Sequence, residues 1–517
     1  MKKTTPEVVM FGHDHISIEK IVALGKKTAE AELSSSPEFR EKLQKSVDFL
    51  NALLKEDGVV YGVTTGYGDS CTIAVPAELV PELPMHLTRF HGCGMGDNFS
   101  PSQSRAIMAT SLSFLSRGLS GVRPAILERL IALLNQDIAP RIPQEGSVGA
   151  SGDLTPLSYV AAVIAGEREV FWAGQLLKTS DVYQKVGLDA IALRPKEGLA
   201  LMNGTAAMTA LSCLAFDRAE YLMRLATRIT AMVVAAMQGN SFHFNERLFA
   251  AKPHPGQQKI AAWLRDDLGS EKLPRNSHRL QDRYSLRCAP HVIGVMGDSL
   301  AWWRQMIENE LNSATDNPLI DGENETVMHG GHFYGGHIAM VMDSMKIAVA
   351  NVADLLDRQL AQLVDPKFNH GLPANLSGSA PERAMINHGF KAVQIAVSSW
   401  TAEALKLTMP ASVFSRSTEC HNQDKVSMGT IAARDCLRIL TLTEQVAAAC
   451  LLASCQALEL RRRDDEMASP HISTELEAMW RDCQAAFAFL DEDRPLETEL
   501  RQFLSLIQEK RWELYND

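Results

Sequence analysis

Apolar residues recur at steps of three and four along most of the chain, which predicts a protein built mainly from α-helices. The clearest stripe includes Val341, Met345, Leu356 and Leu363, and Pro366 ends it. Comparable stripes predict further helices over residues 18–24, 37–54, 102–119, 125–135, 216–238, 386–407 and 428–461, with another helix beginning near Glu82. Helices of this length usually pack side by side in a bundle, so we expect a long-helix bundle downstream of residue 205.

Two glycine-rich segments interrupt the helical pattern near the N-terminus. Residues 61–68 contain three glycines, and residues 92–96 contain three more. Glycine permits close backbone approach and left-handed conformations, so both segments are predicted to be loops. Residues 167–195 are the most plausible place for a few short strands, with a hairpin formed by residues 170–172 and 174–175.

The hydrophobic pattern changes from mixed to entirely helical along the chain, and this change predicts three parts. They are an N-terminal domain over residues 1–205 with a few short strands, a central long-helix bundle over 206–470, and a charged helical tail over 471–517. We find no repeat of fixed period and no low-complexity linker.

Composition and charge narrow the possible functions. The chain has 517 residues, of which 46% are hydrophobic, so it can bury a large core. A net charge of -11 leaves no basic surplus for phosphate backbones, so we expect no nucleic-acid partner, although Arg461, Arg462 and Arg463 form a local basic run. The apolar runs are interrupted by charges or short, so we also expect no membrane span.

The nine cysteines are scattered singly and show no Cys-x-x-Cys pair. This spacing favours neither a disulfide framework nor a zinc ribbon. We therefore expect reduced thiols and a cytoplasmic protein, with no signal peptide at its N-terminus.

The segment 146–154 offers the most specific chemistry. If the amide nitrogen of Gly152 attacks the carbonyl carbon of Ala150 and two waters leave, the tripeptide closes to a methylidene-imidazolone (MIO), a strong electrophile. Gly152 supplies an unshielded amide, Ser151 supplies a hydroxyl that can leave as water, and Ala150 leaves room for a compressed turn. The alternative for the tripeptide alone is an ordinary loop that opens a helix, with Asp153 near the first turn.

Five further segments stand in an order that supports the first interpretation. The whole set resembles the MIO-dependent histidine, phenylalanine and tyrosine ammonia-lyases and aminomutases over almost the full length, and most of all the bacterial tyrosine and phenylalanine ammonia-lyases. The segments are residues 61–68, 149–154, 201–205, 281–288, 312–319 and 421–428. The resemblance implies a helical core like that of fumarase and aspartase, a cofactor made from Ala150, Ser151 and Gly152, and no metal or external cofactor.

The resemblance also implies a role for individual residues. Tyr61 matches the base that removes the β-proton, so its surroundings should stabilise phenolate. Arg287 matches the clamp for the substrate carboxylate, and Asn203, Tyr284 and Gln281 match positions that hold the MIO carbonyl or the substrate. Further substrate-binding positions implied by the resemblance are Gly68, Phe90, His91, Phe333, Lys391, Glu419, Asn422 and Gln423.

Three of these positions bear on which aromatic ring is accepted. Histidine-selective relatives have a glutamate where this chain has Gln423, and Phe90 resembles the wall of phenylalanine-selective members. His91 is then the candidate partner for a ring hydroxyl, although it can also be a packed core histidine. We therefore expect tyrosine first, phenylalanine second and histidine a distant third, with arylacrylate and ammonia as products.

Several alternatives remain open. The same segments serve a histidine ammonia-lyase or an aromatic aminomutase, and an inactive helical scaffold is a remote third possibility. His329, His332 and His337 suggest a metal site, but they lack helical ligand spacing. Thr64, His291 and His332 depart from the usual residues of the family, which puts fine positioning in doubt. The implied site residues lie far apart along the chain, and in the family that the chain resembles such segments meet across subunit boundaries. The resemblance therefore implies a homotetramer with composite active sites.

Overall fold

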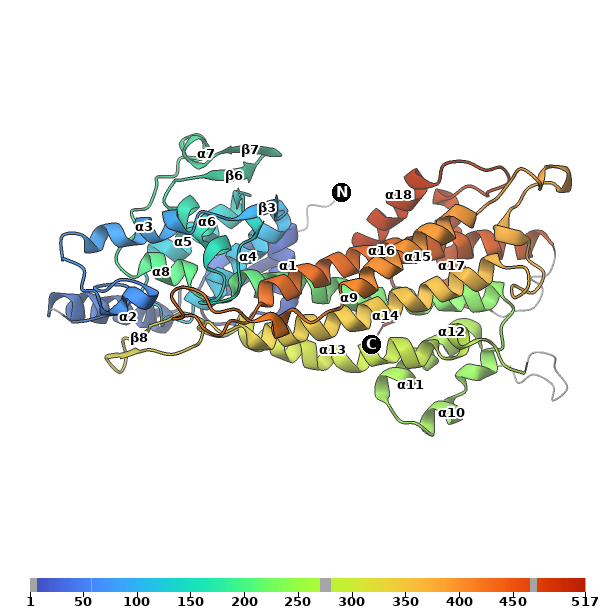
Figure 1. The fold of residues 1–517 in the computed structure, drawn as a ribbon, viewed down its shortest axis with the longest axis horizontal. Helices are drawn as coiled ribbons and strands as arrows, with labels where there is room; N and C mark the ends of the chain where they lie inside the picture. The colour runs from blue at the N-terminus through green and yellow to red at the C-terminus, as the bar shows by residue number, and fades with distance from the viewer. Residues whose placement is uncertain (1–6, 57, 270–279, 465–471, 517) are drawn as a thin grey trace. The chain divides into compact units, whose positions relative to one another are not determined.

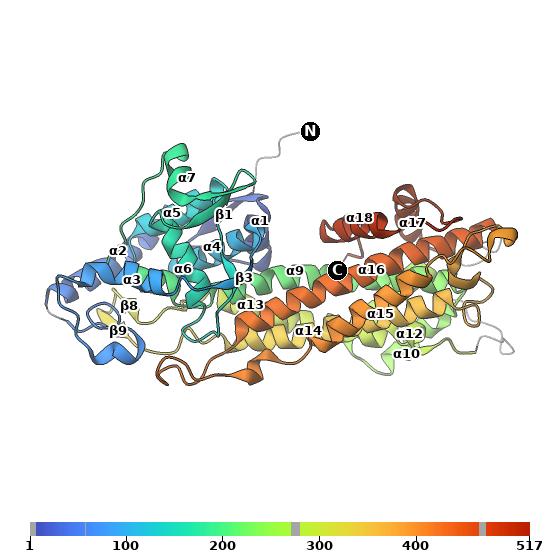
Figure 2. The same cartoon turned by 45° about the horizontal axis from the view of Figure 1, so that its top comes forward.

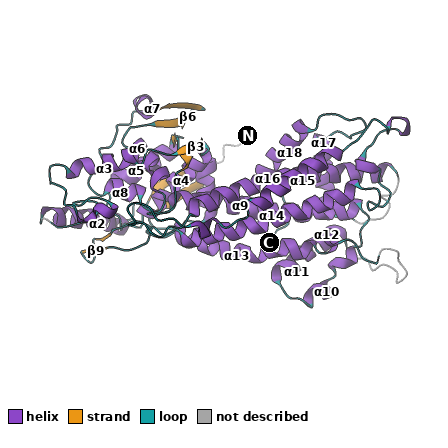
Figure 3. Ribbon diagram, viewed as in Figure 1, coloured by secondary structure: helices purple, strands orange, loops and turns teal. Residues whose placement is uncertain are grey.

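The computed structural model describes residues 7–56, 58–269, 280–464 and 472–516. It confirms a mainly helical fold with few and short strands (Figure 3). The α-helices, labelled in Figure 1, are α1 (Ile18–Lys26), α2 (Pro37–Lys55), α3 (Leu83–Phe90), α4 (Pro101–Leu115), α5 (Pro124–Asn135), α6 (Leu154–Ile164), α7 (Thr179–Val186), α8 (Glu197–Met202), α9 (Ala206–Ala236), α10 (Glu246–Ala250), α11 (Pro255–Leu268), α12 (Tyr284–Arg287), α13 (Ala289–Leu311), α14 (Gly336–Val364), α15 (Lys391–Lys406), α16 (Gly429–Arg463), α17 (Thr474–Ala486) and α18 (Glu497–Gln508). Short 3₁₀ turns add η1 (Gly68–Thr72), η2 (Val80–Glu82), η3 (Ser241–Phe244), η4 (Ala374–Leu376), η5 (Pro381–Arg383) and η6 (Ala411–Phe414).

The strands are more widely distributed than the sequence predicts. The expected hairpin is confirmed, because β6 (Glu169–Trp172) pairs antiparallel with β7 (Gln175–Lys178), and β4 (Ala139–Pro140) extends that sheet. Beyond residues 167–195, however, three further pairs form, so the expected location was too narrow. They are β1 (Glu7–Phe11) with β2 (Ala29–Leu33) in parallel, β3 (Met95–Asn98) with β5 (Pro143–Glu145), and β8 (Leu319–Asp321) with β9 (Thr326–Met328). These strands are short, so alternation along any one of them is a weak signal.

Most predicted helices lie within a few residues of their observed bounds, but two differ. Helix α9 begins at Ala206, ten residues before the predicted start at 216, and α4 ends earlier than expected. Its start at Pro101 is explained by a capping box. The Ser100 hydroxyl accepts from the Gln103 amide, and the Gln103 side chain accepts from the Ser100 amide. The helix ends at Leu115 instead of continuing to Leu119, because Gly118 adopts a left-handed φ of 76° and donates its amide to Leu115.

The described chain divides into two compact units. The first contains residues 1–217, 304–343 and 410–434, and the second contains 218–303, 344–409 and 435–517. Each of the long helices α9, α13, α14 and α16 therefore contributes residues to both units. The linear division at residues 205 and 470 follows sequence texture and stays a prediction.

The second unit contains a bundle of long helices joined by buried polar contacts. The Gln359 amide of α14 donates to the Thr230 hydroxyl of α9 at 3.0 Å, and Ser398 of α15 donates to Asp357 of α14 at 2.9 Å. Cys450 of α16 contacts the carbonyl of Leu356 in α14 at 3.4 Å. Figures 1 and 2 both show α14, α15 and α16 lying side by side.

Helix α16 is long and apolar enough to cross a membrane by length and composition, which exceeds the sequence expectation of short or interrupted runs. Its most apolar stretch is 83% buried inside the protein, as in the core helix of a bundle. The basic run at its end forms no free patch, because Arg461 is buried and donates to the carbonyls of Ala236 and Asn369. Arg462 and Arg463 both pair with Glu459.

Candidate active site

The turn around Ser151 is fixed by a second glycine from a distant segment. Gly152 has φ of 73° and forms a parallel β-bridge with Gly204. The Gly204 amide donates to the Ser151 carbonyl at 3.0 Å, and the Asp153 amide donates to the Gly204 carbonyl at 2.7 Å. A Cβ on Gly152 would overlap the carbonyl oxygen of Gly204. Residue 152 must therefore be glycine for both its conformation and its surroundings.

The buried carboxylate of Asp153 stabilises the Ser151 turn. Asp153 has no exposed surface, and its Oδ1 accepts hydrogen bonds from the hydroxyls of Ser147, at 3.0 Å, and Thr430. Its Oδ2 accepts from the backbone amide of Met208 at 2.8 Å, in the first turn of α9. Burial raises the pKa of Asp153, and these hydrogen bonds act in the opposite direction. The turn is thus tied to both α9 and α16.

The residues at the turn fit the MIO cofactor. Ala150 is buried, Ser151 is half-buried, and no Cβ stands on the Gly152 side of the ring that the tripeptide would form. The Gln423 amide donates to the Ser151 hydroxyl at 3.3 Å, so a polar side chain already reaches the atom that must leave as water. The left-handed φ of 73° at Gly152 is a conformation that glycine adopts readily and other residues rarely adopt.

Tyr61 lies on a loop that is anchored by its apolar neighbours. Val60 and Val63 are buried in a small cluster with Leu50 and Ile320, which leaves Tyr61 between them half-buried. Thr64, one of the departures from the family pattern, accepts a hydrogen bond from the Val60 amide at 2.9 Å, so it stabilises this loop.

The phenol oxygen of Tyr61 has two identified neighbours. It accepts a hydrogen bond from the Gly68 amide at 2.8 Å. The carboxylate of Glu419 accepts from the next amide, that of Asp69, at 2.9 and 3.0 Å. A Cβ on Gly68, whose φ is 56°, would overlap that carboxylate. Gly68 therefore lets Tyr61 and Glu419 approach each other closely.

This environment corrects the expectation that the surroundings of Tyr61 favour phenolate. Burial raises the pKa of Tyr61, the Gly68 hydrogen bond lowers it, and the negative charge of Glu419 raises it again. The balance is an increase, so within one chain the phenol is held in its protonated form. The sequence could not show this, because it reveals neither the burial of the phenol, which is the largest cause, nor its proximity to a carboxylate 358 positions away.

A strained loop brings Glu419 and Gln423 to these positions. Glu419, Cys420 and His421 are consecutive residues with φ of 51°, 52° and 66°. Non-glycine residues rarely adopt such angles, and a run of three is found where the surrounding structure imposes it, often at a functional site. A bridge between Thr418 and Gln423 closes the loop, and the Thr418 hydroxyl donates to the Gln423 side-chain carbonyl at 3.0 Å. Tyr61, Gly68, Glu419, Gln423 and Ser151 thus form one connected set in the first unit.

His91 and Phe90 stand at the end of α3, also in the first unit. Their rings are tilted against each other with centroids 4.5 Å apart. His91 is half-buried, while Phe90 is 59% exposed. Burial, with a smaller contribution from the charge of Arg168, lowers the pKa of His91 to about 4. The ring is therefore neutral at physiological pH.

Asn203 is buried beside the Ser151 turn, next to Gly204, but its amide nitrogen is engaged elsewhere. It donates to the Asp316 carboxylate at 3.3 Å and to the Asn317 carbonyl at 2.8 Å. The buried Lys196 forms an ion pair with the same carboxylate. Two acceptors therefore hold the nitrogen, and among the described residues the buried Asn203 carbonyl oxygen has no hydrogen-bond partner. The expected contact of Asn203 with the MIO carbonyl or the substrate stays a prediction.

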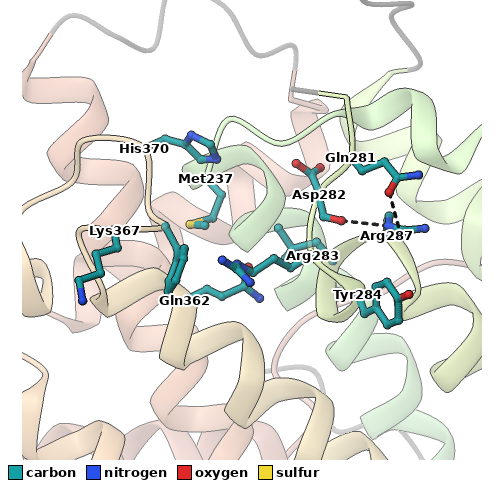
Figure 4. Close-up of a pocket in the computed structure, with 11 residues that line it drawn as sticks. Met237, Gln281, Asp282, Arg283, Tyr284, Arg287, Gln362, Lys367 and His370 are labelled. Atoms are coloured by element: carbon teal, nitrogen blue, oxygen red, sulfur yellow. Dashed lines mark hydrogen bonds between the residues drawn. The ribbon is translucent and has the colours of Figure 1, made fainter. Parts of the chain in front are cut away.

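Gln281, Tyr284 and Arg287 lie in the second unit, where they line a pocket of about 610 Å³ (Figure 4). Arg287 donates to the Asp282 carbonyl at 2.9 Å and to the Gln281 side chain at 3.3 Å, and its guanidinium lies 4.7 Å from the centre of the Tyr284 ring. Tyr284 is 73% exposed. The pocket thus presents a cation and a phenol that are open to an incoming anion.

The remaining predicted site residues are half-buried or exposed. Phe333 is half-buried and Asn422 is exposed, both in the first unit, whereas Lys391 is exposed at the start of α15 in the second unit. Over the described ranges, no group of three or more His, Cys, Asp or Glu side chains could hold a metal ion, and His329 and His332 are exposed.

Three supporting residues were missed by the sequence interpretation. Asp153 was expected near the first turn of α6, with no role for its side chain. Its carboxylate accepts hydrogen bonds from Met208 of α9 and Thr430 of α16. Lys196 and Asp316 form a buried pair behind Asn203. Asp316 stands in the family segment 312–319, which was the available signal, whereas Lys196 gave none.

Comparison with known proteins places the chain in a family. A model of the family named aromatic amino acid lyase matches residues 16–484. The histidine ammonia-lyase of Gloeobacter violaceus is 36% identical over 510 residues, which cover 98% of this chain and 97% of that protein. That of Geobacillus sp. (strain WCH70) is 39% identical over 429 residues, which cover 83% and 84%. The solved structure of a tyrosine aminomutase from Streptomyces globisporus gives a TM-score of 0.90 at 32% identity and covers 98% of this chain and 97% of that one.

These relatives do not support the expected order of substrates. Both curated relatives are histidine ammonia-lyases, so histidine, which was placed last, fits the comparisons better than tyrosine does. The match to the family covers most of the chain, including every predicted site residue. The chain belongs to the aromatic amino acid lyase family and is a carbon–nitrogen lyase.

Proposed function

We propose that the protein removes ammonia from an aromatic L-amino acid without oxidation and releases the arylacrylate. The observation that carries this proposal is the turn at residues 150–152, in which the left-handed Gly152 is bridged to Gly204 and Ser151 contacts Gln423. When formed from this tripeptide, MIO supplies the electrophile that makes the amine a better leaving group.

The chain's own residues then bind the substrate and move its β-proton. Tyr61 accepts the β-proton at its phenol oxygen, which the Gly68 amide stabilises as phenolate. Glu419 lies beside it and opposes ionisation of the phenol. A substrate ammonium that pairs with Glu419 would neutralise this carboxylate and so favour the phenolate once substrate is bound. The Arg287 guanidinium holds the substrate carboxylate.

For the ring, the comparisons favour L-histidine as the main substrate. The curated relatives that span most of this chain are histidine ammonia-lyases. The neutral His91 ring supports this choice, because a neutral imidazole offers one donor and one acceptor to a second imidazole.

Tyrosine is the second candidate, and Gln423 is the observation that favours it. Where an imidazole-binding carboxylate is expected, this chain places a neutral amide whose nitrogen and oxygen are occupied by Ser151 and Thr418. The tyrosine aminomutase structure also leaves open that ammonia is returned to the β-carbon, as an aminomutase would do.

We further propose that the active form is a homotetramer in which Tyr61 and Ser151 of one subunit act with Arg287 of another. On α13, Val295 and Trp302 are 56% and 40% exposed and lie seven positions apart, so they share one helix face. Apolar residues exposed in this way are typical of subunit interfaces. A cytoplasmic location suits the free thiols of Cys71, Cys93 and Cys420, which are exposed.

The proposal is tested with purified protein and L-histidine, L-tyrosine and L-phenylalanine, because the three arylacrylates have distinct ultraviolet spectra. We expect product and ammonia, together with an ultraviolet band from MIO in the resting protein. Ser151→Ala should lose the band and the activity, whereas Ser180→Ala, an exposed serine on α7, should keep both. Ammonia release by Ser151→Ala, or none by the wild type on any of the three amino acids, would refute the proposal.

A further inference from the structure

Arg168 lies in the turn between α6 and β6, and its side chain reaches the segment that carries Phe90 and His91. Its Nη2 donates to the Thr88 carbonyl at 2.6 Å, and its Nη1 donates to the Ser158 hydroxyl at 3.0 Å. The backbone of Arg168 is itself fixed, with φ of 64° and a carbonyl that accepts from both the amide and the hydroxyl of Thr179. The guanidinium thus extends from a rigid base.

A second contact connects this network to His91. The Ser158 hydroxyl, which accepts the Arg168 hydrogen bond, shares its one proton between the Thr155 carbonyl at 2.7 Å and the His91 carbonyl at 3.2 Å. Arg168 also lies over the ring of Tyr159, at 4.1 Å from its centre, so the guanidinium is packed as well as hydrogen-bonded. A Cβ on Gly92 would overlap the Arg168 guanidinium, which explains the glycine directly after His91.

The same arrangement sets the charge near the His91 ring. Burial and the positive charge of Arg168 both lower the pKa of His91. The other cation nearby on α3, Arg89, is paired with Glu167 at 2.7 Å. Burial lowers the pKa of Arg168, and the neighbouring Tyr159 and Cys93 oppose this effect. A neutral imidazole with a fixed backbone can donate from one nitrogen and accept at the other.

We propose that Arg168 is a positioning residue which fixes the segment that carries His91, and that this sets which aromatic ring the enzyme selects. This inference rests on the proposed function, because it assigns His91 to the substrate ring. Arg168 acts through Thr88, Ser158 and the positive charge that it places near His91.

The test separates the charge of Arg168 from its hydrogen bonds. Arg168→Gln removes the charge, Arg168→Lys keeps the charge but loses the paired donors, and Arg89→Gln removes the adjacent surface ion pair as a matched control. The His91 ring is titrated by NMR, with His91→Gln identifying its signal, and kcat/KM is measured for histidine, tyrosine and phenylalanine. Circular dichroism verifies that each variant is folded.

We expect Arg168→Gln to raise the pKa of His91 by about one unit and to change the ratio of kcat/KM between two rings by about tenfold, because a cation has been removed and the ring is freed. Arg168→Lys should leave the pKa low but still reduce the selectivity, and Arg89→Gln should change neither. An unchanged pKa together with unchanged selectivity in folded Arg168→Gln would overturn the inference. If the wild type has no activity, the proposed function is overturned instead. The NMR titration would still report whether Arg168 affects the pKa of His91, so the two failures can be distinguished.

Discussion

The Ser151 turn and the Arg287 pocket both belong to the proposed reaction, but the protein holds them in different ways. At the turn, Asp153 has no exposed surface and accepts hydrogen bonds from the backbone and from hydroxyls. In the pocket, Tyr284 is 73% exposed, and Arg287 donates to Asp282 and Gln281 and lies over the Tyr284 ring. The turn must be compressed before any substrate arrives, whereas the pocket must stay open for an anion. Changes at the turn should therefore affect folding and chemistry together, and changes in the pocket should affect binding.

The largest effect is expected from Gly152→Ala, compared with Gly174→Ala. Both glycines have positive φ, of 73° and 75°, but a Cβ on Gly152 meets the Gly204 carbonyl, while a Cβ on Gly174 has no heavy atom within 4 Å. Each variant should lose about 1 kcal/mol through the backbone conformation. Only Gly152→Ala should also lose the MIO band and roughly 10³-fold or more in kcat. Equal absorbance and activity in the two variants would show that the turn is not compressed in the active protein.

Arg287→Ala should come next, with a decrease in kcat/KM of about 100-fold, mainly through KM, because the carboxylate loses a bidentate partner. Arg287→Lys should retain only part of the kcat/KM that Arg287→Ala loses, because an ammonium cannot make the planar bidentate contact of a guanidinium. Thermal unfolding should be nearly unchanged, because the Arg287 contacts are few and partly exposed. Lys367→Met, in the same pocket, is the control for loss of charge alone. A decrease as large in that variant would mean that Arg287 acts only as a general positive charge.

Asp153→Asn should mainly lower stability, by about 1–3 kcal/mol in the free energy of unfolding, because an amide cannot accept all three hydrogen bonds that the carboxylate accepts. Denaturant unfolding measures the loss, and Asp181→Asn, at an exposed position of α7, provides the control. If the two variants are equally stable, the buried network does not hold the turn.

The smallest expected effect is a shift in the pH profile of Glu419→Gln. The charge of Glu419 raises the pKa of Tyr61, so its removal lowers that pKa. A base works in its deprotonated form, and the rising limb of kcat/KM against pH should therefore move to lower pH, by about half to one unit. Glu382→Gln, an exposed change in the second unit, should leave the limb in place. A shift to higher pH would exclude this assignment of Tyr61 and Glu419.

The sequence by itself predicted most of the helices and supplied the basis for the chemistry proposed at the turn. Apolar spacing gave α2, α5, α14 and α16 close to their observed bounds, because a long helix repeats its signal over many turns. Ala150, Ser151 and Gly152 are adjacent in the chain, so their possible cyclisation can be read directly from it.

Only the tertiary structure decided which distant residues support that chemistry. It buried Tyr61 and brought Glu419 near its phenol, and burial first and this charge second raise the Tyr61 pKa, against the expected direction. It tied Asp153 to Met208, and it turned the Asn203 amide nitrogen towards Asp316. It also formed the parallel pair of β1 and β2. Hydrogen bonds, charges and strand pairs act over a few ångströms in space, and sequence spacing carries no such distance for residues separated by tens or hundreds of positions.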